Sequence, residues 1–470
     1  MSGSSVMPRP LGDVVVLGAS VAGLLTAAAL SELADSVRVI DRDDLGGDLE
    51  APRDGTPQAG HTHAVLMGGL AAMDDLLPGL SASLVDDGAL LADVLGRTRW
   101  IVDDLQQAHQ ASGDAWMLVS RTLLESRLRR RVRALPGVSL TGGLDIGSPV
   151  VEPGSRRISG VVVTPRSGPS AASETLTADL VVDATGRAPR SVAWLRGLGL
   201  DEPPETVVEA GVRYVTRRFR HEPGVLEGYD AELVGPHLGS QRCGVALRQE
   251  HDTWTVTLIG RFGEDPPLDL DGFREFARSL PSTGIAEVTQ RCTPTTEPLR
   301  ATFPVSRWRH WEKLETRLAG LVVVGDAVAS VNPSAGQGMT MSALQVRALR
   351  DVVREHGADR LEARAAAALA NAVADPWVMG TSYDTAYLKA GGSSVADRVL
   401  DAYLDRVIAV GTQRPEVAHA LTRVLHLVDS TSALLRPSIA WAVLGPGSRR
   451  AVARAKAERT TRHAAAAARV

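Results

Sequence analysis

The beginning of the chain passes from an apolar run through a small-residue turn into a helical pattern. Residues 14–17 are Val-Val-Val-Leu without polar alternation, as expected of a strand buried on both faces of a parallel sheet. Leucine and alanine then recur at helical spacing over 24–30. The segment Val-Arg-Val-Ile at 37–40 is followed by Asp41 and predicts a neighbouring strand. Together these patterns predict an α/β fold.

The strand-to-turn pattern returns about 300 residues later. Residues 321–324 predict another buried strand, which Gly325 and Asp326 follow. A loop with Pro333 and Gly336-x-Gly338 then opens a helix. Two regions far apart in the chain therefore share the pattern of a buried strand, a glycine-containing turn and the start of a helix.

Between these regions the apolar period falls towards two. The segments VRYVTRRF, CGVALRQE and WTVTLIGR predict antiparallel strands within 206–300, and DLDGFREFARSL predicts a short helix. From residue 343 onward the pattern is mostly helical, with breaks predicted at Asp375-Pro376 and at Gly391-Gly392. The chain thus combines a parallel sheet, an antiparallel sheet and a helical C-terminal region.

Composition excludes several classes of protein. A formal charge of -4 on 470 residues argues against a nucleic-acid partner, because phosphate binding needs a basic face. Cys243 and Cys292 form no CxxC pair, so we expect neither a disulfide framework nor a thiolate metal site. No signal peptide or transmembrane segment is predicted. We expect a cytoplasmic protein.

The first turn matches two of the three glycines in the dinucleotide pattern G-x-G-x-x-G. Gly18 would make the turn and Gly23 would let the helix pack on the strand, while Ser20 replaces the glycine that lets backbone approach a pyrophosphate. Asp41 lies about 20 residues further on, where an acid accepts ribose hydroxyls. We expect a cofactor to contact Gly18, Ser20, Ala22, Gly23, Asp41 and Arg42. The alternative is an α/β turn without a nucleotide.

The second turn favours a flavin over NAD. Asp326 at a strand end can accept polyol hydroxyls, and the amides of 336–339 at a helix start present partial positive charge to an electron-rich ring edge. A ribityl chain and an isoalloxazine ring need these two features. The predicted cofactor contacts of this turn are Gly325, Asp326, Pro333, Gly336, Gly338 and Met339.

With both turns present, the sequence resembles the FAD-dependent monooxygenases of the para-hydroxybenzoate hydroxylase type. Three more segments carry this resemblance: RDGTPQAGHTH at 53–63, SRTLLESRLRRRV from 120, and ADLVVDATGRAPRS at 178–191. The resemblance implies further FAD contacts from Arg53, Gln58, His61, Arg121 and Asp183.

Each of these segments also has a simpler interpretation. His61-x-His63 could bind a metal, but it lacks a third ligand nearby, so we expect no metal. The basic residues after Arg121, at 127, 129, 130, 131 and 133, are expected to form a solvated helix face. Asp183 could merely cap the next turn.

The nearest resemblance is to the flavin-dependent epoxidases of polyether antibiotic biosynthesis, which also share DPWVMGTSYD at 375–384. It implies oxygen transfer from a flavin C4a-hydroperoxide to the alkenes of a hydrophobic polyketide, with O2 as co-substrate. Because the flavin carries the reactive atom, we name no catalytic residue. The chain has D-A-T-G-R in place of the Asp-Gly fingerprint of aromatic hydroxylases, so the electron source is either NAD(P)H or a separate flavin reductase.

Other functions of the same fold stay open. They are an aromatic hydroxylase, a prenyl or alkene reductase, a halogenase, and a flavoprotein without enzymatic activity. A halogenase would need a lysine beside a tunnel and usually W-x-W-x-I-P, whereas this chain has only RWRHW at 307–311.

The resemblance also divides the chain into domains. We expect a discontinuous, Rossmann-like FAD-binding domain, an inserted antiparallel sheet that binds substrate, and a C-terminal helical region; their ranges are 1–85, 111–205 and 300–345, then 86–110 and 206–299, then 346–470. Four side chains of the antiparallel sheet are candidates for the substrate pocket, although each could be ordinary core: Tyr214, Phe219, Trp254 and Leu258.

Overall fold

Five parallel strands form the sheet that the first part of the chain predicts. The computed structural model describes residues 11–46, 53–166, 172–236, 240–388 and 395–467. Val16 and Leu17 have no exposed surface, as expected of a strand covered on both faces. In spatial order the strands are β18 (Leu321–Val323), β12 (Leu180–Asp183), β1 (Asp13–Leu17), β2 (Ser36–Ile40) and β8 (Val138–Thr141).

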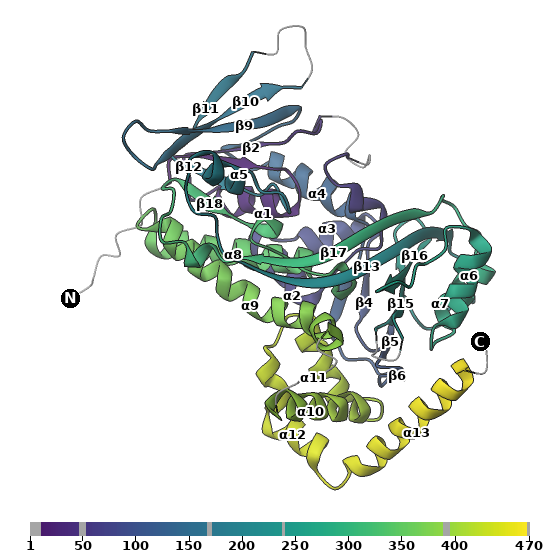
Figure 1. Cartoon of the computed structure of the whole chain (residues 1–470). Coiled ribbons are helices and arrows are strands. Elements are labelled where there is room, and N and C mark those ends of the chain that lie inside the picture. The colour runs from purple at the N-terminus through teal and green to yellow at the C-terminus, as the bar shows by residue number, and fades with distance from the viewer. Residues whose placement is uncertain (1–10, 47–52, 167–171, 237–239, 389–394, 468–470) are drawn as a thin grey trace.

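Helices and a small sheet enclose this parallel sheet (Figure 1). Helix α1 (Val21–Leu30) packs against both α4 (Arg121–Arg133) and α8 (Gly338–His356), and α2 (Met67–Leu76) also packs on α8. On the other side lie β9 (Leu144–Val151), β10 (Ile158–Pro165) and β11 (Glu174–Thr177), with β10 in contact with β12. One hydrophobic core runs through these layers.

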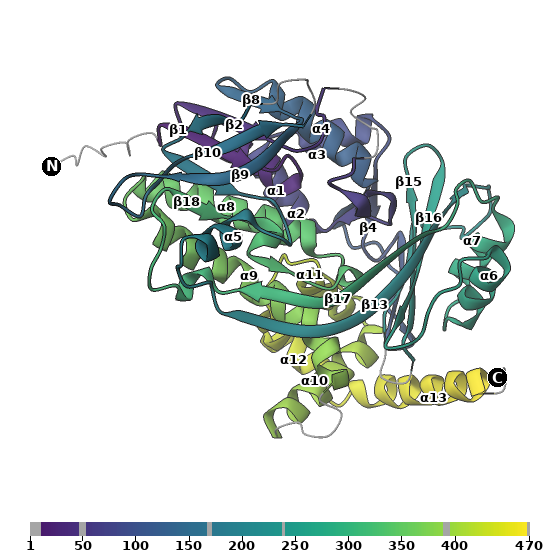
Figure 2. The same cartoon turned by 45° about the horizontal axis from the view of Figure 1, so that its top comes forward.

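The second large sheet has eight strands and is mostly antiparallel. Its longest members, β13 (Glu205–Arg220) and β17 (Leu299–Arg309), cross from the parallel-sheet half to the far end of the molecule (Figure 2). The remaining strands are β14 (Ala231–Val234), β15 (Arg242–Gln249), β16 (Thr253–Arg261), β5 (Thr98–Val102), β6 (Leu105–Gln106) and β19 (Ala329–Ser330). Helices α6 (Leu270–Ser279) and α7 (Gly284–Arg291) cover one face.

Two strands lie outside the domains in which the sequence places them. The range 300–309 was assigned to the FAD-binding domain, but β17 pairs with β13 along most of its length. Conversely, β4 (Leu90–Asp93) pairs with β7 (Ala115–Leu118) beside β3 (Ala64–Val65), and not with the antiparallel sheet that β5 and β6 join. Strand partners are long-range choices that local period does not encode.

The C-terminal region is helical, as predicted. However, α9 (Leu361–Leu388) runs through Pro376, where the sequence predicted a break, because buried side chains along the helix, from Leu369 to Asp384, hold it against the core. Gly391-Gly392 lie outside the described residues. The other helices are α10 (Val395–Gly411), α11 (Pro415–Leu425), α12 (Pro437–Leu444) and α13 (Ser448–Ala467), and α3 (Leu80–Asp86) lies near the N-terminal half. The predicted α/β fold class is confirmed.

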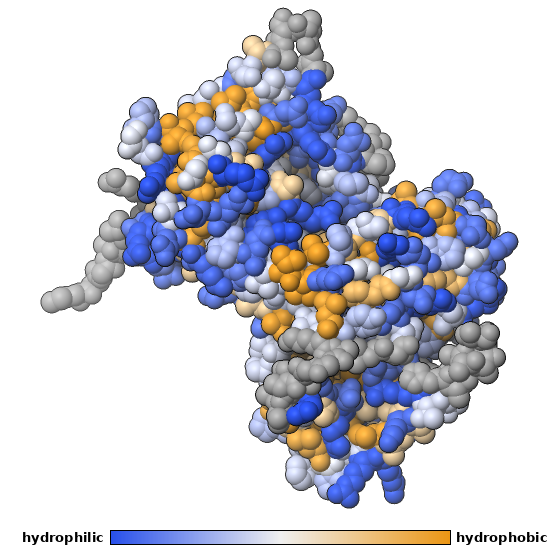
Figure 3. All heavy atoms as spheres, in the orientation of Figure 1, coloured by the Kyte–Doolittle hydropathy of each residue, from blue (hydrophilic) through white to orange (hydrophobic). Residues whose placement is uncertain are grey.

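The face of the molecule shown in Figure 3 is mainly hydrophilic. On the face shown in Figure 3, apolar residues form separate patches between charged and polar ones. Among the helices that the structure describes, none is both long enough and apolar enough to cross a membrane.

Candidate functional site

The first turn packs so closely that two of its glycines are obligatory. A Cβ atom on Gly23 would lie 1.8 Å from the carbonyl oxygen of Gly18, and one on Gly18 would lie 2.7 Å from that of Ala184. Gly18 also has a φ of +101°, which disfavours other residues. Ser20, in contrast, has an ordinary extended backbone with φ -98°. The turn therefore tolerates serine at its second position.

The two turns meet at one edge of the parallel sheet. A Cβ atom on Gly325 would lie 2.7 Å from the Cβ atom of Ala22, so the segments after β18 and β1 touch each other. Gly325 has a φ of +70°, and its N–H donates to the side chain of Gln345 on α8 over 2.9 Å. The carboxyl edge of a parallel sheet is the usual place for ligands in such folds.

Two helices begin at this edge with unpaired backbone donors. The first N–H groups of α1, from Val21, and of α8, from Gly338, have no acceptor within their own helices. A Cβ atom on Gly338 would meet nothing within 4 Å, which leaves open space before α8. Gly336 ends the preceding turn with φ +66°, Pro333 is exposed, and Met339 is buried behind the helix start. Anionic or electron-rich groups are favoured at such positions.

A buried carboxylate organises the side chains under the first turn. Glu125 on α4 accepts hydrogen bonds from Ser20 Oγ (2.6 Å), Arg121 Nε (2.8 Å) and Arg53 Nη2 (2.6 Å). Burial alone would raise the pKa of Glu125, but Arg121 and Arg53 lower it to about 2. Glu125 is therefore ionised and fixes both guanidinium groups beside Ser20.

Arg53 has donors to spare at this position. Its side chain is only 8% exposed, yet Nε and Nη1 have no hydrogen-bond acceptor. The nearest carboxylates to Nη1 are Asp41 at 3.7 Å and Asp43 at 3.6 Å. Buried guanidinium donors normally have acceptors, and a pyrophosphate between Arg53 and the start of α1 would supply them. The residues present therefore fit the phosphate part of a dinucleotide.

The other predicted contacts of the first turn divide into two groups. Asp41 lies at the turn, where its Oδ2 accepts a hydrogen bond from Ala19 N over 2.6 Å. Arg42 is exposed and its guanidinium donates to the backbone oxygen of Asp54 (3.3 Å). Gln58, in the short 3-10 turn Pro57–Gly60, is also exposed. The structure thus brings Asp41 to the turn and leaves Arg42 and Gln58 at the surface.

The two remaining aspartates, Asp326 and Asp183, differ in whether their carboxylates already have hydrogen-bond partners. Asp326 makes no side-chain hydrogen bond among the described residues, and burial raises its pKa against the opposing effect of Arg187. Such a carboxylate fits a cofactor hydroxyl. Asp183 instead accepts hydrogen bonds from Thr185 N and Oγ1 with one oxygen and from Ser191 N with the other. Its geometry favours the capping role over contact with a cofactor.

The segment around His61 packs against the antiparallel sheet. His61 Nδ1 lies 2.7 Å from Thr216 Oγ1, and its ring meets Tyr214 edge-on at 4.7 Å. Thr216 Oγ1 in turn lies 2.6 Å from Thr257 Oγ1. Burial lowers the pKa of His61 to about 4 and that of His63 to about 3, so both rings are neutral at pH 7. Among the described residues no group of His, Cys, Asp and Glu could hold a metal ion.

Three of the four residues predicted to shape the substrate pocket lie on the opposite face of the antiparallel sheet. Phe219, Trp254 and Leu258 lie in the core between the antiparallel sheet and helices α6 and α7. Tyr214 lies on the other face of the same sheet, where its ring contacts His61. The prediction that Phe219, Trp254 and Leu258 shape a cavity is therefore wrong, because strand residues one position apart lie on opposite faces.

Sequence reasoning missed Glu125 and misassigned Arg129. Arg129 was expected on a solvated face, but its side chain is 3% exposed and lies 3.5 Å from Glu125. The signal was available: Arg121, Glu125, Leu128 and Val132 recur at helical spacing, and therefore share one face of α4. Of the basic run, Arg130 and Arg133 are exposed.

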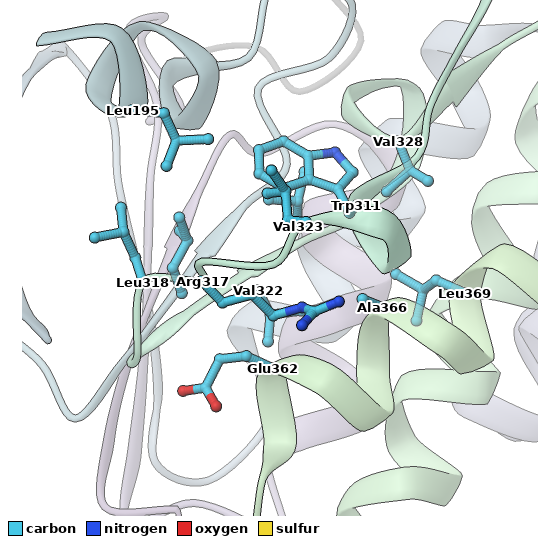
Figure 4. Close-up of a pocket in the computed structure, with 12 residues that line it drawn as sticks. Leu195, Trp311, Arg317, Leu318, Val322, Val323, Val328, Glu362, Ala366 and Leu369 are labelled. Atoms are coloured by element: carbon cyan, nitrogen blue, oxygen red, sulfur yellow. The ribbon is translucent and has the colours of Figure 1, made fainter. Parts of the chain in front are cut away.

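A separate cavity lies behind β18 and does not belong to this site. Figure 4 shows that Trp311, Val323 and Leu369 point into it, with Arg317 and Glu362 beside it. Its volume of about 40 Å³ is far below the roughly 300 to 1,000 Å³ of ordinary ligand pockets. It cannot hold a dinucleotide.

One relative in sequence matches nearly the whole chain, while no family model matches. Protein Rv3254 of Mycobacterium tuberculosis is 32% identical over 436 residues, which cover 90% of this chain and 91% of that protein.

Solved structures show the fold. The flavin-dependent brominase Bmp2 aligns with TM-score 0.64 and 12% identity over 90% of this chain and 97% of its own. The p-nitrophenol 4-monooxygenase PnpA of Pseudomonas putida aligns with TM-score 0.60 and 16% identity over 89% and 98%. PqsL of Pseudomonas aeruginosa, a probable FAD-dependent monooxygenase, aligns with TM-score 0.58 and 16% identity over 80% and 96%. The chain thus has the fold of FAD-dependent monooxygenases and halogenases, and it belongs to the family of Protein Rv3254.

Proposed function

We propose that this chain is an FAD-dependent monooxygenase that oxygenates a hydrophobic small molecule. The observation that carries the proposal is the contact between Gly325 and Ala22, because it joins the two predicted cofactor turns at one ligand-binding edge. The adenylate half of FAD would lie between the start of α1, Asp41 and Arg53, and the ring would lie before α8. Bound FAD would supply the activation of O2, which side chains cannot provide.

The residues of this chain would bind, orient and shield the cofactor. Arg53 and Arg121, held by Glu125, would donate to the phosphates, and Asp326 would accept from the ribityl chain. The N–H groups at the start of α8 would stabilise negative charge on the reduced ring. The face of the antiparallel sheet with Tyr214 would cover the ring and exclude water.

The substrate is proposed to be a polyketide whose alkenes are epoxidised. The support is the resemblance to polyether epoxidases, and in particular the segment 375–384, which lies within α9 and carries buried Trp377 and Asp384 towards the core. An aromatic hydroxylase is the second candidate, because PnpA shares the fold. A halogenase fits less well, because the chain has no W-x-W-x-I-P stretch and because Lys313 and Lys456 are exposed. Electrons would come from NAD(P)H or from a separate flavin reductase.

Oxygen labelling tests this proposal. FAD-loaded protein is reduced without O2, mixed with a linear polyene or with a phenol, and exposed to isotopically labelled O2. Label in an epoxide of the polyene supports epoxidation, and label in the phenol ring supports aromatic hydroxylation. Saturation of the polyene without label would identify a reductase, and a protein that binds no FAD would contradict the whole proposal.

A further inference from the structure

A second buried arginine has unused donors, and it lies on the face of the antiparallel sheet that carries Tyr214. Arg261 is the last residue of β16 and is only 2% exposed. Within the sheet Arg261 pairs with Val212, Ile259 with Tyr214, and Thr257 with Thr216. Since alternate residues share a face, Arg261 lies on the face that carries Tyr214 and meets His61.

Only part of this guanidinium is satisfied. Nη2 donates to Asp384 on α9, and the group stacks over the ring of Tyr383 with 4.7 Å from Cζ to the ring centroid. Nε and Nη1 are buried and have no acceptor. Arg53 is the other arginine of the described residues with both of these atoms buried and unpaired, and there a pyrophosphate is the expected acceptor. An unpaired buried donor is costly, so Nε and Nη1 of Arg261 call for an acceptor. The nearby Oε1 of Gln241, next to the β15 residue that pairs with Gly260, is itself buried and unpaired and makes no hydrogen bond with them.

Hydrogen bonds connect Arg261 to the loop before α8. Asp384 accepts a hydrogen bond from Asn332 Nδ2 over 3.1 Å. The Oδ1 atom of Asn332 accepts hydrogen bonds from Ser334 N (3.0 Å) and Ser334 Oγ (2.8 Å), which fixes the turn that begins at Pro333. An acceptor at Arg261 would therefore lie near the loop that is proposed to hold the flavin ring.

The surroundings of Arg261 limit the chemistry of this acceptor. Arg261 and the fully buried Asp384 form a pair without net charge, so a further buried carboxylate would leave an uncompensated negative charge. A neutral oxygen avoids this charge and still satisfies the free N–H groups. Val212, Cys243, Ile259 and Phe303 form one buried apolar cluster on the same sheet face, while Gln241 and Tyr383 place polar groups beside Arg261.

We propose that Arg261 is a specificity-determining residue that donates hydrogen bonds to a neutral carbonyl oxygen of an otherwise apolar substrate. This inference rests on the proposed function, because that function places substrate on this face of the sheet. It adds that the substrate carries a ketone, ester or amide carbonyl within reach of the flavin ring site. A plain hydrocarbon would leave the Arg261 donors unpaired and would bind more weakly.

Matched probes test the inference on FAD-loaded protein in its oxidised state. The probes are 2-decanone and 2-methyl-1-decene, in which a methylene group replaces the carbonyl oxygen. Their dissociation constants are measured by calorimetry for the wild type and for Arg261→Lys, which keeps the charge beside Asp384 but loses the planar fork of donors. We expect the ketone to bind about tenfold more tightly than the alkene to the wild type, and about equally in R261K.

Arg217→Lys is the control, because Arg217 is a buried arginine of β13 whose guanidinium lies near Phe273 on the opposite face. R217K should keep the preference for the ketone. If R261K fails to fold, the double variant R261M/D384L removes the buried pair as a unit and should likewise lose the preference.

Equal binding of the two probes to the wild type, or no binding of either, would overturn the inference. So would a crystal structure of the ketone complex in which water alone contacts Nε and Nη1. FAD content is measured in the same samples: a colourless protein contradicts the proposed function, whereas a yellow protein without ketone preference contradicts only the role of Arg261.

Discussion

The two halves of the proposed site are built by different means. At the cofactor edge the backbone makes the site, because Gly18, Gly23 and Gly325 approach neighbouring atoms so closely that no side chain fits. On the sheet face the site depends on side chains from separate strands, such as Thr216 and Thr257, whose hydroxyls meet over 2.6 Å. A site made by backbone depends on a short local sequence pattern and can be predicted from it. A site made by side chains of several strands depends on how the strands pair, which no local pattern gives.

The largest effect on stability is expected at Gly23, where the backbones of α1 and of the turn after β1 are in contact. Gly23→Ala should destabilise the fold by about 4 kcal/mol or more, because its Cβ would lie 1.8 Å from Gly18 O and α1 would have to move away from β1. Gly197→Ala is the control, since a Cβ there meets nothing within 4 Å. Urea unfolding checks both variants. A G23A protein of wild-type stability would remove the physical basis of the first turn.

The two faces of β13 can be separated by truncation. Phe219→Ala should lower the free energy of unfolding by about 3 to 4 kcal/mol, because Phe219 is fully buried against α6, and FAD affinity of the folded fraction should not change. Tyr214→Phe keeps the ring and should change both stability and FAD affinity little. Denaturant titrations and FAD titrations of both variants test this contrast. Weaker FAD binding in F219A than in Y214F would contradict it.

A smaller effect is expected at the phosphate position. Arg53→Met should weaken FAD binding about 30-fold, equivalent to about 2 kcal/mol, because a charge-assisted pair of donors is lost. Arg42→Met should change the affinity little, since Arg42 is exposed. Fluorescence quenching of FAD measures both. Equal losses in R53M and R42M would show that Arg53 does not face the phosphates.

A substitution at Gly338 tests whether the open space before α8 is needed by the fold or by a bound ligand. A Cβ there meets no protein atom within 4 Å, so Gly338→Ala should leave the stability of the cofactor-free protein unchanged or slightly higher. If the flavin ring lies before α8, FAD affinity should fall about tenfold, or about 1.4 kcal/mol. Thermal unfolding without FAD and FAD titration give the two readouts. Unchanged affinity would place the ring elsewhere.

The smallest effect at neutral pH is expected from His61, which contributes to stability changes only in acid. His61 has a pKa lowered to about 4, so the unfolded chain binds more protons than the folded one between pH 6.5 and 4. The free energy of unfolding should therefore decrease as the pH is lowered from 6.5 to 4, by up to about 1.4 kcal/mol per pH unit for this group. His61→Gln should flatten the slope, whereas exposed His251→Asn should not. Parallel slopes in wild type and H61Q would contradict the burial of a neutral ring.

The same contrast explains what sequence could predict. The turns at Gly18 and Gly325, the strands before them and the helices after them follow local patterns, and the structure has each of them. Glu125 could have been found from the face it shares with Arg121 on α4. The orientation of Phe219 could not, because period two marks alternating residues without saying which face meets the helices. The pairing of β17 with β13 is equally a choice between distant partners.

The central claim is that two distant turns hold one flavin, and titration of purified protein with FAD tests it most directly. We predict saturation at one FAD per chain, quenched flavin fluorescence, and weaker binding in both Arg53→Met, at the first turn, and Gly338→Ala, at the second. A protein that binds no FAD, or one whose affinity responds to neither variant, would contradict the account.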